Sequence, residues 1–175
     1  MHYGNIKFND ISNGPGIRTS LFVSGCRNKC EFCFNKETWD FNYGDLFTND
    51  TLIKVLDSLS PNYVNGLTLL GGEPMEEENQ EELLNLCLKV NEMYPNKTIW
   101  CFTGYTYDKD LLINGRKHTK YTDELIKCLD VLVDGRFIND LKNIRLQFRG
   151  SKNQRIIDIK ETIKHGHVVI DKNYF

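Results

Sequence analysis

The chain has 175 residues, of which 40% are hydrophobic and 26% are charged, with a formal net charge of -2 at pH 7. This length predicts one domain, residues 1–175, that can bury a sizeable core. The near balance of charge gives no reason to expect a nucleic-acid partner.

The first residues lack the apolar core of a signal peptide, and no apolar run approaches membrane-spanning length. Three of the six cysteines fall within eight residues, too close together for an ordinary disulfide framework. We therefore expect a cytoplasmic protein in a reducing compartment, without a membrane partner.

Taken in order, the chain first shows a weak strand signal, because Ile6 and Phe8 alternate with polar residues. Residues 13–16, with the sequence Asn-Gly-Pro-Gly, predict a turn. Residues 18–24 predict a strand that leads directly into the cysteine-rich stretch. The amino-terminal part is therefore expected to be irregular or to form a hairpin.

Strands and helices then alternate. Helices are predicted at 48–59, 76–94 and 122–129, and strands at 66–70, 98–103 and 131–134. The first helix carries Leu52, Val55, Leu56 and Leu59 on one apolar stripe. Two apolar runs at 156–159 and 167–170 leave open whether they pair as a terminal hairpin. The basic cluster 117–120 is read as a solvated surface.

This alternation predicts an α/β fold with βαβ units and right-handed crossovers. A closed (β/α)8 barrel typically needs about 250 residues, so the chain is too short for one. We expect an open, mainly parallel sheet that forms a shortened partial (β/α) barrel. In such folds chemistry gathers at the carboxyl ends of the strands. The cysteine stretch and the Gly71-Gly72-Glu73-Pro74 turn both follow predicted strands.

Cys26, Cys30 and Cys33 have the spacing C-x3-C-x2-C and are the candidate metal ligands. Three thiolates on one loop can hold a metal ion or an iron–sulfur cluster. Structural zinc usually has four ligands, and the four histidines are isolated or terminal. A [4Fe–4S] cluster held by three cysteines leaves one iron open. The spacing favours the cluster over zinc without deciding between them.

The same cysteine spacing, with Phe32 directly before the third cysteine, resembles the signature of the radical S-adenosylmethionine superfamily. Gly71-Gly72-Glu73 resembles that superfamily's GGE motif, in which backbone groups hold the amino group of the cofactor. Both motifs occur in the expected order, each after a strand.

Several further stretches resemble the activases of glycyl radical enzymes, specifically the branch that acts on anaerobic ribonucleoside-triphosphate reductase. These stretches are 13–18, 34–39, 100–105, 131–137 and 149–155, and the likeness extends over about 3–158. Residues 36–65 contain no cysteine, so the inserted ferredoxin-like domain of other activases is absent. Phe34 departs from the family, which often has tyrosine there.

The resemblance implies a [4Fe–4S] cluster on Cys26, Cys30 and Cys33, with S-adenosyl-L-methionine bound to its open iron. Cofactor contacts are expected from Phe32, Cys33, Phe34, Gly71, Gly72 and Glu73, with no separate catalytic side chain. Reductive cleavage would give methionine and a 5′-deoxyadenosyl radical, which takes a hydrogen atom from a glycine of the reductase.

The implied partners are the catalytic subunit of the anaerobic reductase and a low-potential electron donor such as flavodoxin. The alternatives are an activase of another glycyl radical enzyme and a binding module with structural zinc. Cys87, Cys101 and Cys128 are read as core residues. Arg18 is assigned either to a carboxylate or partner contact or to a surface salt bridge. The roles of Asp134 and Arg136 stay open.

Overall fold

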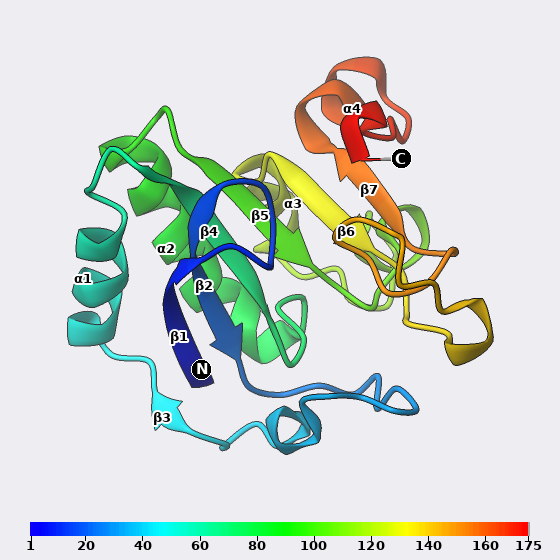
Figure 1. The fold of residues 1–175 in the computed structure, drawn as a ribbon, viewed down its shortest axis with the longest axis horizontal. Coiled ribbons are helices and arrows are strands. Elements are labelled where there is room, and N and C mark those ends of the chain that lie inside the picture. Colours follow the sequence, from blue (N-terminus) through cyan, green and yellow to red (C-terminus); the bar gives the residue numbers. More distant parts are fainter. Residues whose placement is uncertain (175) are drawn as a thin grey trace.

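The computed structural model describes residues 1–174 and is built on one twisted sheet of seven strands (Figure 1). The strands are β1 (His2–Asp10), β2 (Ile17–Val23), β3 (Asp45–Leu46), β4 (Val64–Gly71), β5 (Thr98–Phe102), β6 (Val131–Asp134) and β7 (Arg155–Asp158). The α-helices are α1 (Asn49–Ser58), α2 (Glu77–Met93), α3 (Thr122–Lys127) and α4 (Ile159–His165). Short 3-10 turns are η1 (Lys36–Trp39), η3 (Asn139–Leu141) and η4 (Lys172–Tyr174), and η2 (Tyr107–Leu111) is a π-helical turn.

The strand order is β3-β1-β2-β4-β5-β6-β7. The central strands β2, β4, β5 and β6 are parallel, and the outer pairs β1/β2, β1/β3 and β6/β7 are antiparallel. The sheet is open. This confirms the predicted α/β fold class with an open, mainly parallel sheet.

The register brings the carboxyl ends of the parallel strands side by side. Val23 at the end of β2 lies beside Gly71 at the end of β4, and Phe102 at the end of β5 lies beside Val133 of β6. The segments that follow these strands therefore emerge along one edge of the sheet, as expected for a parallel α/β arrangement.

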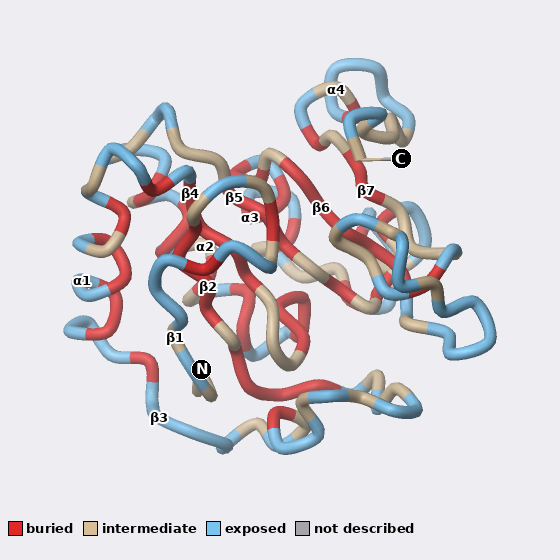
Figure 2. Tube along the Cα trace, in the orientation of Figure 1, coloured by how far each residue is buried: buried red, intermediate tan, exposed pale blue. Residues whose placement is uncertain are grey.

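One face of the sheet is covered by helices. Leu69, Ile99, Cys101 and Leu132 point from the central strands into the main core, which also holds the apolar faces of α1, α2 and α3. Alternate residues of the same strands face the other way, as the two-residue period of a strand requires. Figure 2 shows the central strands and the inner sides of the helices as buried.

The opposite face has a smaller core around Trp100. The rings of Phe148 and Tyr174 pack against Trp100 at centroid distances of 5.4 and 5.3 Å. Tyr174 comes from the tail and Phe148 from the loop between β6 and β7. The carboxyl-terminal end of the chain therefore covers part of the sheet face that the helices leave open.

Arg18 is fully buried on this face, and both readings of it from the sequence are wrong. Its guanidinium donates to Thr68 Oγ1 at 2.7 Å, to the carbonyl oxygen of Leu67 at 2.7 Å and to that of Thr98 at 2.8 Å. It contacts neither a carboxylate nor the surface. Arg18 instead ties β2 to the adjacent strand β4 and to β5 beyond it through neutral acceptors.

The structure answers two questions that the sequence left open: whether the amino-terminal part forms a hairpin, and whether the two apolar runs near the carboxyl end pair with each other. β1 and β2 form a hairpin, so the hairpin reading of the amino-terminal part is confirmed. The run 156–159 pairs with 167–170 through one antiparallel bridge between Ile157 and Ile170, with hydrogen bonds from Asp158 N to Val169 O at 3.0 Å and from Asp171 N to Ile156 O at 2.8 Å. Helix α4 lies between the two runs, and the other edge of β7 pairs with β6, so this is a short pairing and not a simple hairpin. Within residues 1–174, no helix combines the length and apolarity needed to cross a bilayer.

Candidate cofactor site

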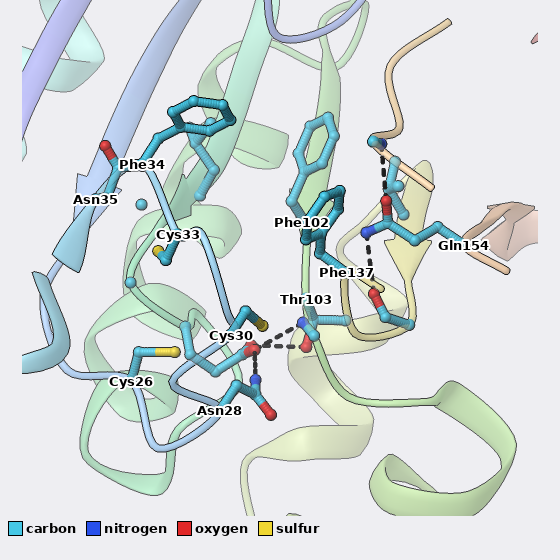
Figure 3. A pocket seen from close by; sticks show the side chains of 18 of the residues that line it. Cys26, Asn28, Cys30, Cys33, Phe34, Asn35, Phe102, Thr103, Phe137 and Gln154 are labelled. Carbon is cyan, nitrogen blue, oxygen red and sulfur yellow. Dashed lines mark hydrogen bonds between the residues drawn. The ribbon is translucent and has the colours of Figure 1, made fainter. Parts of the chain in front are cut away.

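A pocket of about 340 Å³ lies at the carboxyl edge of the parallel strands. Its lining includes every residue that the sequence predicted for the site: Cys26, Cys30, Phe32, Cys33, Phe34, Gly71, Gly72 and Glu73. These residues come from two segments separated by almost forty positions in the sequence. Figure 3 shows the three cysteine side chains along one side of the pocket and Phe102, Phe137 and Gln154 along the other.

The cysteine loop, residues 24–44, leaves β2 and returns to the sheet at β3. Its base is closed by backbone hydrogen bonds from Gly25 N to Thr38 O at 2.8 Å and from Cys26 N to Trp39 O at 3.3 Å. Lys29 and Phe32 adopt left-handed backbone conformations, with φ of 45° and 58°. The loop therefore turns sharply twice between its first and third cysteines.

The three thiols line one pocket, but they are not arranged around the position of a single metal ion. No group of three His, Cys, Asp or Glu side chains in residues 1–174 is arranged to hold one metal ion. In a cluster, by contrast, each cysteine binds a different iron. Burial is the main cause that raises the pKa of the Cys26 thiol to about 12, so metal loading must displace a proton from it.

The Gly71-Gly72 turn lies directly against the cysteine loop. Gly72 N donates to Val23 O at 2.7 Å, and Glu73 N donates to Gly25 O at 2.9 Å. A Cβ on Gly72 would lie 2.8 Å from Gly25 O and 2.9 Å from Thr38 O, which are backbone atoms of the same loop. The absence of a side chain at Gly72 is therefore required for this close approach.

Glu73 links three segments around the pocket. Its carboxylate accepts hydrogen bonds from Asn28 Nδ2 at 2.8 Å, Thr103 Oγ1 at 2.6 Å, Gly104 N at 2.7 Å and Met75 N at 3.0 Å. Burial raises the pKa of Glu73 to about 7, even though its hydrogen bonds act in the opposite direction. Glu73 thus joins the cysteine loop to the end of β5.

A second buried carboxylate, that of Glu76, binds the cysteine loop at Arg27. It accepts hydrogen bonds from the backbone N and guanidinium of Arg27 at 2.8 and 2.7 Å, from Tyr105 Oη at 2.8 Å and from Lys117 Nζ at 2.8 Å. Burial opposes ionisation of Glu76, but these donors keep its pKa below the usual range. The residue after Cys26 is therefore fixed by a network of charged groups.

Comparison of the sequence with known proteins identifies a matching family model and several relatives. A family model described as a 4Fe-4S single cluster domain matches residues 12–157. The anaerobic ribonucleoside-triphosphate reductase-activating protein of Enterobacteria phage T4 is 40% identical over 156 residues, which are 89% of this chain and 93% of the phage protein. The proteins of the same name from Salmonella typhi and Escherichia coli K12 are 39% and 38% identical over 147 residues, 83% of this chain and 90% of theirs.

The chain belongs to the anaerobic ribonucleoside-triphosphate reductase-activating protein family. The family resemblance inferred from the sequence motifs is thereby confirmed. The matched region spans the cysteine loop, the Gly-Gly-Glu turn and all of the strands β2 to β7 except the end of β7.

The side chains of this family member are suited to a cluster with a bound organic cofactor. Thiolates are the ligands that iron–sulfur clusters prefer. Phe32, Phe34, Phe102 and Phe137 give the pocket aromatic walls, which suit a flat heterocycle. Trp39, which also lines the pocket, has a buried Nε1 without a protein acceptor, so one donor remains for a bound group.

Sequence reasoning misjudged the basic cluster at 117–120. Lys117 is buried, with its ammonium on Glu76 and 3.6 Å from a carboxylate oxygen of Glu77, so the solvated reading is wrong for it. Asp134 is also structural, because Arg155 binds its carboxylate and the N–H of Tyr107 donates to it at 2.8 Å. Arg136 is exposed and lies in the chain between the pocket-lining residues Gly135 and Phe137.

Other pocket residues were not assigned to the site from the sequence. They are Asn28, Asn35, Trp39, Leu70, Phe102, Thr103, Gly104, Val133, Gly135, Phe137, Gly150 and Gln154. Thr103, Gly104 and Gly135 lie in stretches that resemble the family and at the ends of predicted strands, so the sequence does predict that their turns lie at this edge of the sheet. Asn28 could not be assigned, because its only distinguishing feature is the contact with Glu73.

Proposed function

We propose that this protein activates an anaerobic ribonucleoside-triphosphate reductase by generating a glycyl radical on the catalytic subunit of that enzyme. It does so as a single radical S-adenosylmethionine domain over residues 1–175. The observation that supports this most strongly is the meeting of the cysteine loop and the Gly-Gly-Glu turn in one pocket.

Cys26, Cys30 and Cys33 are the proposed ligands of a [4Fe–4S] cluster, and S-adenosyl-L-methionine occupies the rest of the pocket. When bound, the reduced cluster would supply one electron to break the S–C5′ bond of S-adenosylmethionine, which would give methionine and a 5′-deoxyadenosyl radical able to take a hydrogen atom from a glycine Cα. Gly71 and Gly72 offer bare backbone to the cofactor, and Glu73 holds the loop that carries the ligands.

The aromatic residues of the pocket have a second role. Phe102 and Phe137 stand opposite the cysteines and restrict the access of water to the reacting atoms (Figure 3). A reactive carbon radical needs this shielding from side reactions. Phe32 and Phe34 are the proposed cofactor contacts on the ligand side.

The proposed setting is the cytoplasm, with a low-potential donor such as flavodoxin as the source of electrons. All six cysteines are free thiols in the described residues 1–174, as a reducing compartment requires. The proposal needs neither nucleic acid nor membrane.

The test is anaerobic reconstitution with iron and sulfide, followed by metal analysis and measurement of 5′-deoxyadenosine under dithionite. We expect iron and sulfide in cluster proportions and cleavage of S-adenosylmethionine by the wild type. Cys30→Ala should abolish cleavage, whereas Cys128→Ala, a matched change outside the pocket, should preserve it. Stoichiometric zinc without sulfide would contradict the proposal and favour a zinc-binding module.

The choice of target enzyme needs a separate measurement. Mixing the reduced protein and S-adenosylmethionine with the anaerobic reductase should give the EPR doublet of a glycyl radical. A doublet on a different glycyl radical enzyme, and none on the reductase, would show that the target is another member of that group.

A further inference from the structure

The loop between β6 and β7 projects from the sheet beside the pocket. We refer to residues 136–152 of this loop as the basic finger (Figure 1). Its base lines the pocket through Phe137 and Gly150. Its two arms are held together by the bridge between Lys142 and Ser151 and by the bond from Lys152 N to Leu141 O at 2.9 Å. The finger is therefore an ordered element.

The composition of the finger differs from that of the rest of the chain. It contains five Lys or Arg residues and one Asp, whereas the whole chain has a net charge of -2. The cations Arg136, Lys142, Arg145 and Lys152 are exposed, and among residues 1–174 none of their side chains has a carboxylate partner. This leaves an uncompensated positive charge on a loop whose base lines the pocket.

Large apolar side chains are exposed on the same surface. Ile144 at the tip of the finger is 89% exposed, with Ile138 and Leu141 also exposed nearby in sequence. The cysteine loop on the other side of the pocket presents Phe34 at 90% exposure and Phe32 at 60%. Apolar side chains that flank a pocket and are accompanied by charge are typical of a protein interaction site.

We propose that the basic finger, together with Phe32 and Phe34, is the docking surface for an acidic segment of the reductase that also carries apolar side chains. This inference rests on the proposed function, which requires the target glycine to reach the pocket. The finger is the part of the described chain that combines free positive charge, exposed apolar side chains and a base inside the pocket wall. An acidic partner segment is the complement to that charge.

The experiment compares Lys142→Glu/Arg145→Glu with the wild type. Neither residue lines the pocket. With dithionite as reductant, cleavage of S-adenosylmethionine in the absence of the reductase should match the wild type. The apparent dissociation constant for the purified catalytic subunit should rise by about tenfold or more, and the yield of glycyl radical at limiting protein should fall accordingly. Binding by the wild type should weaken with added salt more steeply than binding by the variant.

Lys54→Glu/Lys89→Glu is the matched control, because it makes the same change of charge on helices α1 and α2. It should bind the reductase as the wild type does. Equal binding and radical yield in the finger variant would overturn the inference. So would a defect that appears with a protein electron donor and not with dithionite, because the finger would then serve the donor. Loss of cleavage in the wild type itself would instead refute the proposed function.

Discussion

The ammonium of Lys117 lies 2.8 Å from Oε2 of Glu76, and both side chains are almost entirely buried. The pair joins the segment before α3 to the start of α2. Because Glu76 also binds Arg27, the contact extends to the cysteine loop. A residue far from the motifs in sequence thus helps to hold the proposed ligands in place.

Lys117→Met should be strongly destabilising, because it leaves Glu76 buried with one fewer cation. Breaking a buried ion pair on one side costs about 3–5 kcal/mol. Chemical denaturation of the apoprotein measures this loss. Lys120→Met, which changes an exposed neighbour, should alter the free energy of unfolding by less than about 0.5 kcal/mol. Equal stability of the two variants would show that the buried pair is unimportant.

Gly72→Ala should displace the cysteine loop, because the new Cβ would meet the backbone oxygens of Gly25, Thr38 and Val23 at 2.8 to 3.0 Å. We expect a loss of about 1–3 kcal/mol and markedly weaker binding of S-adenosylmethionine to the reconstituted protein. Gly166→Ala separates this effect from backbone strain. Its φ is +70° with nothing within 4 Å of the new Cβ, so it should cost about 1 kcal/mol without changing cofactor affinity.

Arg18→Lys should destabilise the sheet despite keeping the charge. The lysine ammonium cannot reach the acceptors on Thr68, Leu67 and Thr98 with the geometry of the guanidinium fork. We expect a loss of about 2–4 kcal/mol, since several buried carbonyl and hydroxyl groups lose their donor. Thermal unfolding provides the measurement, with Arg145→Lys on the exposed finger as the control. A Tm unchanged from the wild type would contradict this role for Arg18.

Asp10 should contribute to stability in a pH-dependent way. Burial opposes its ionisation, but donors from Lys7, Ser20, Asn13 and Ser12 outweigh that cost and hold the pKa of Asp10 well below 3.8. A carboxyl group whose pKa is lowered by folding stabilises the protein above its unfolded value, and this contribution is lost as the pH falls through the folded value.

Unfolding of the wild-type apoprotein should therefore become easier below about pH 4, and Asp10→Asn should flatten this acid dependence. The variant should also be less stable than the wild type at neutral pH. Denaturation at a series of pH values tests both statements. An unchanged slope in the variant would assign the acid sensitivity to other carboxyl groups.

The sheet and the two cofactor motifs could be predicted because their signals are local. Short apolar runs predict the central strands, and parallel strands must bring their carboxyl ends to one edge. That rule brings Cys26 and Gly72 together without any knowledge of distances. Helix α4 was missed although Asp158 and Glu161 have the spacing of a capping box, and Asp158 Oδ1 accepts from Glu161 N at 2.9 Å.

The rest of the site depends on contacts between loops, and sequence spacing does not determine these. Lys117 lies among polar and charged residues, so its composition indicated a solvated surface. Its burial follows from the position of Glu76, which is set by the turn after Glu73. The role of Asn28 likewise depends on its hydrogen bond to the carboxylate of Glu73.

The cysteine loop has both of its ends attached to the first residues of the chain. Ser24 N donates to His2 O at 2.9 Å, and Asp45 on the far side pairs with Tyr3 in the sheet. Formation of the sheet therefore already brings the two ends of this loop together. A flexible chain would instead lose the corresponding conformational entropy when it bound a cluster. The three thiols are held at a high effective concentration before any iron arrives, and trimming the first three residues would lower that concentration without removing any of the proposed ligands.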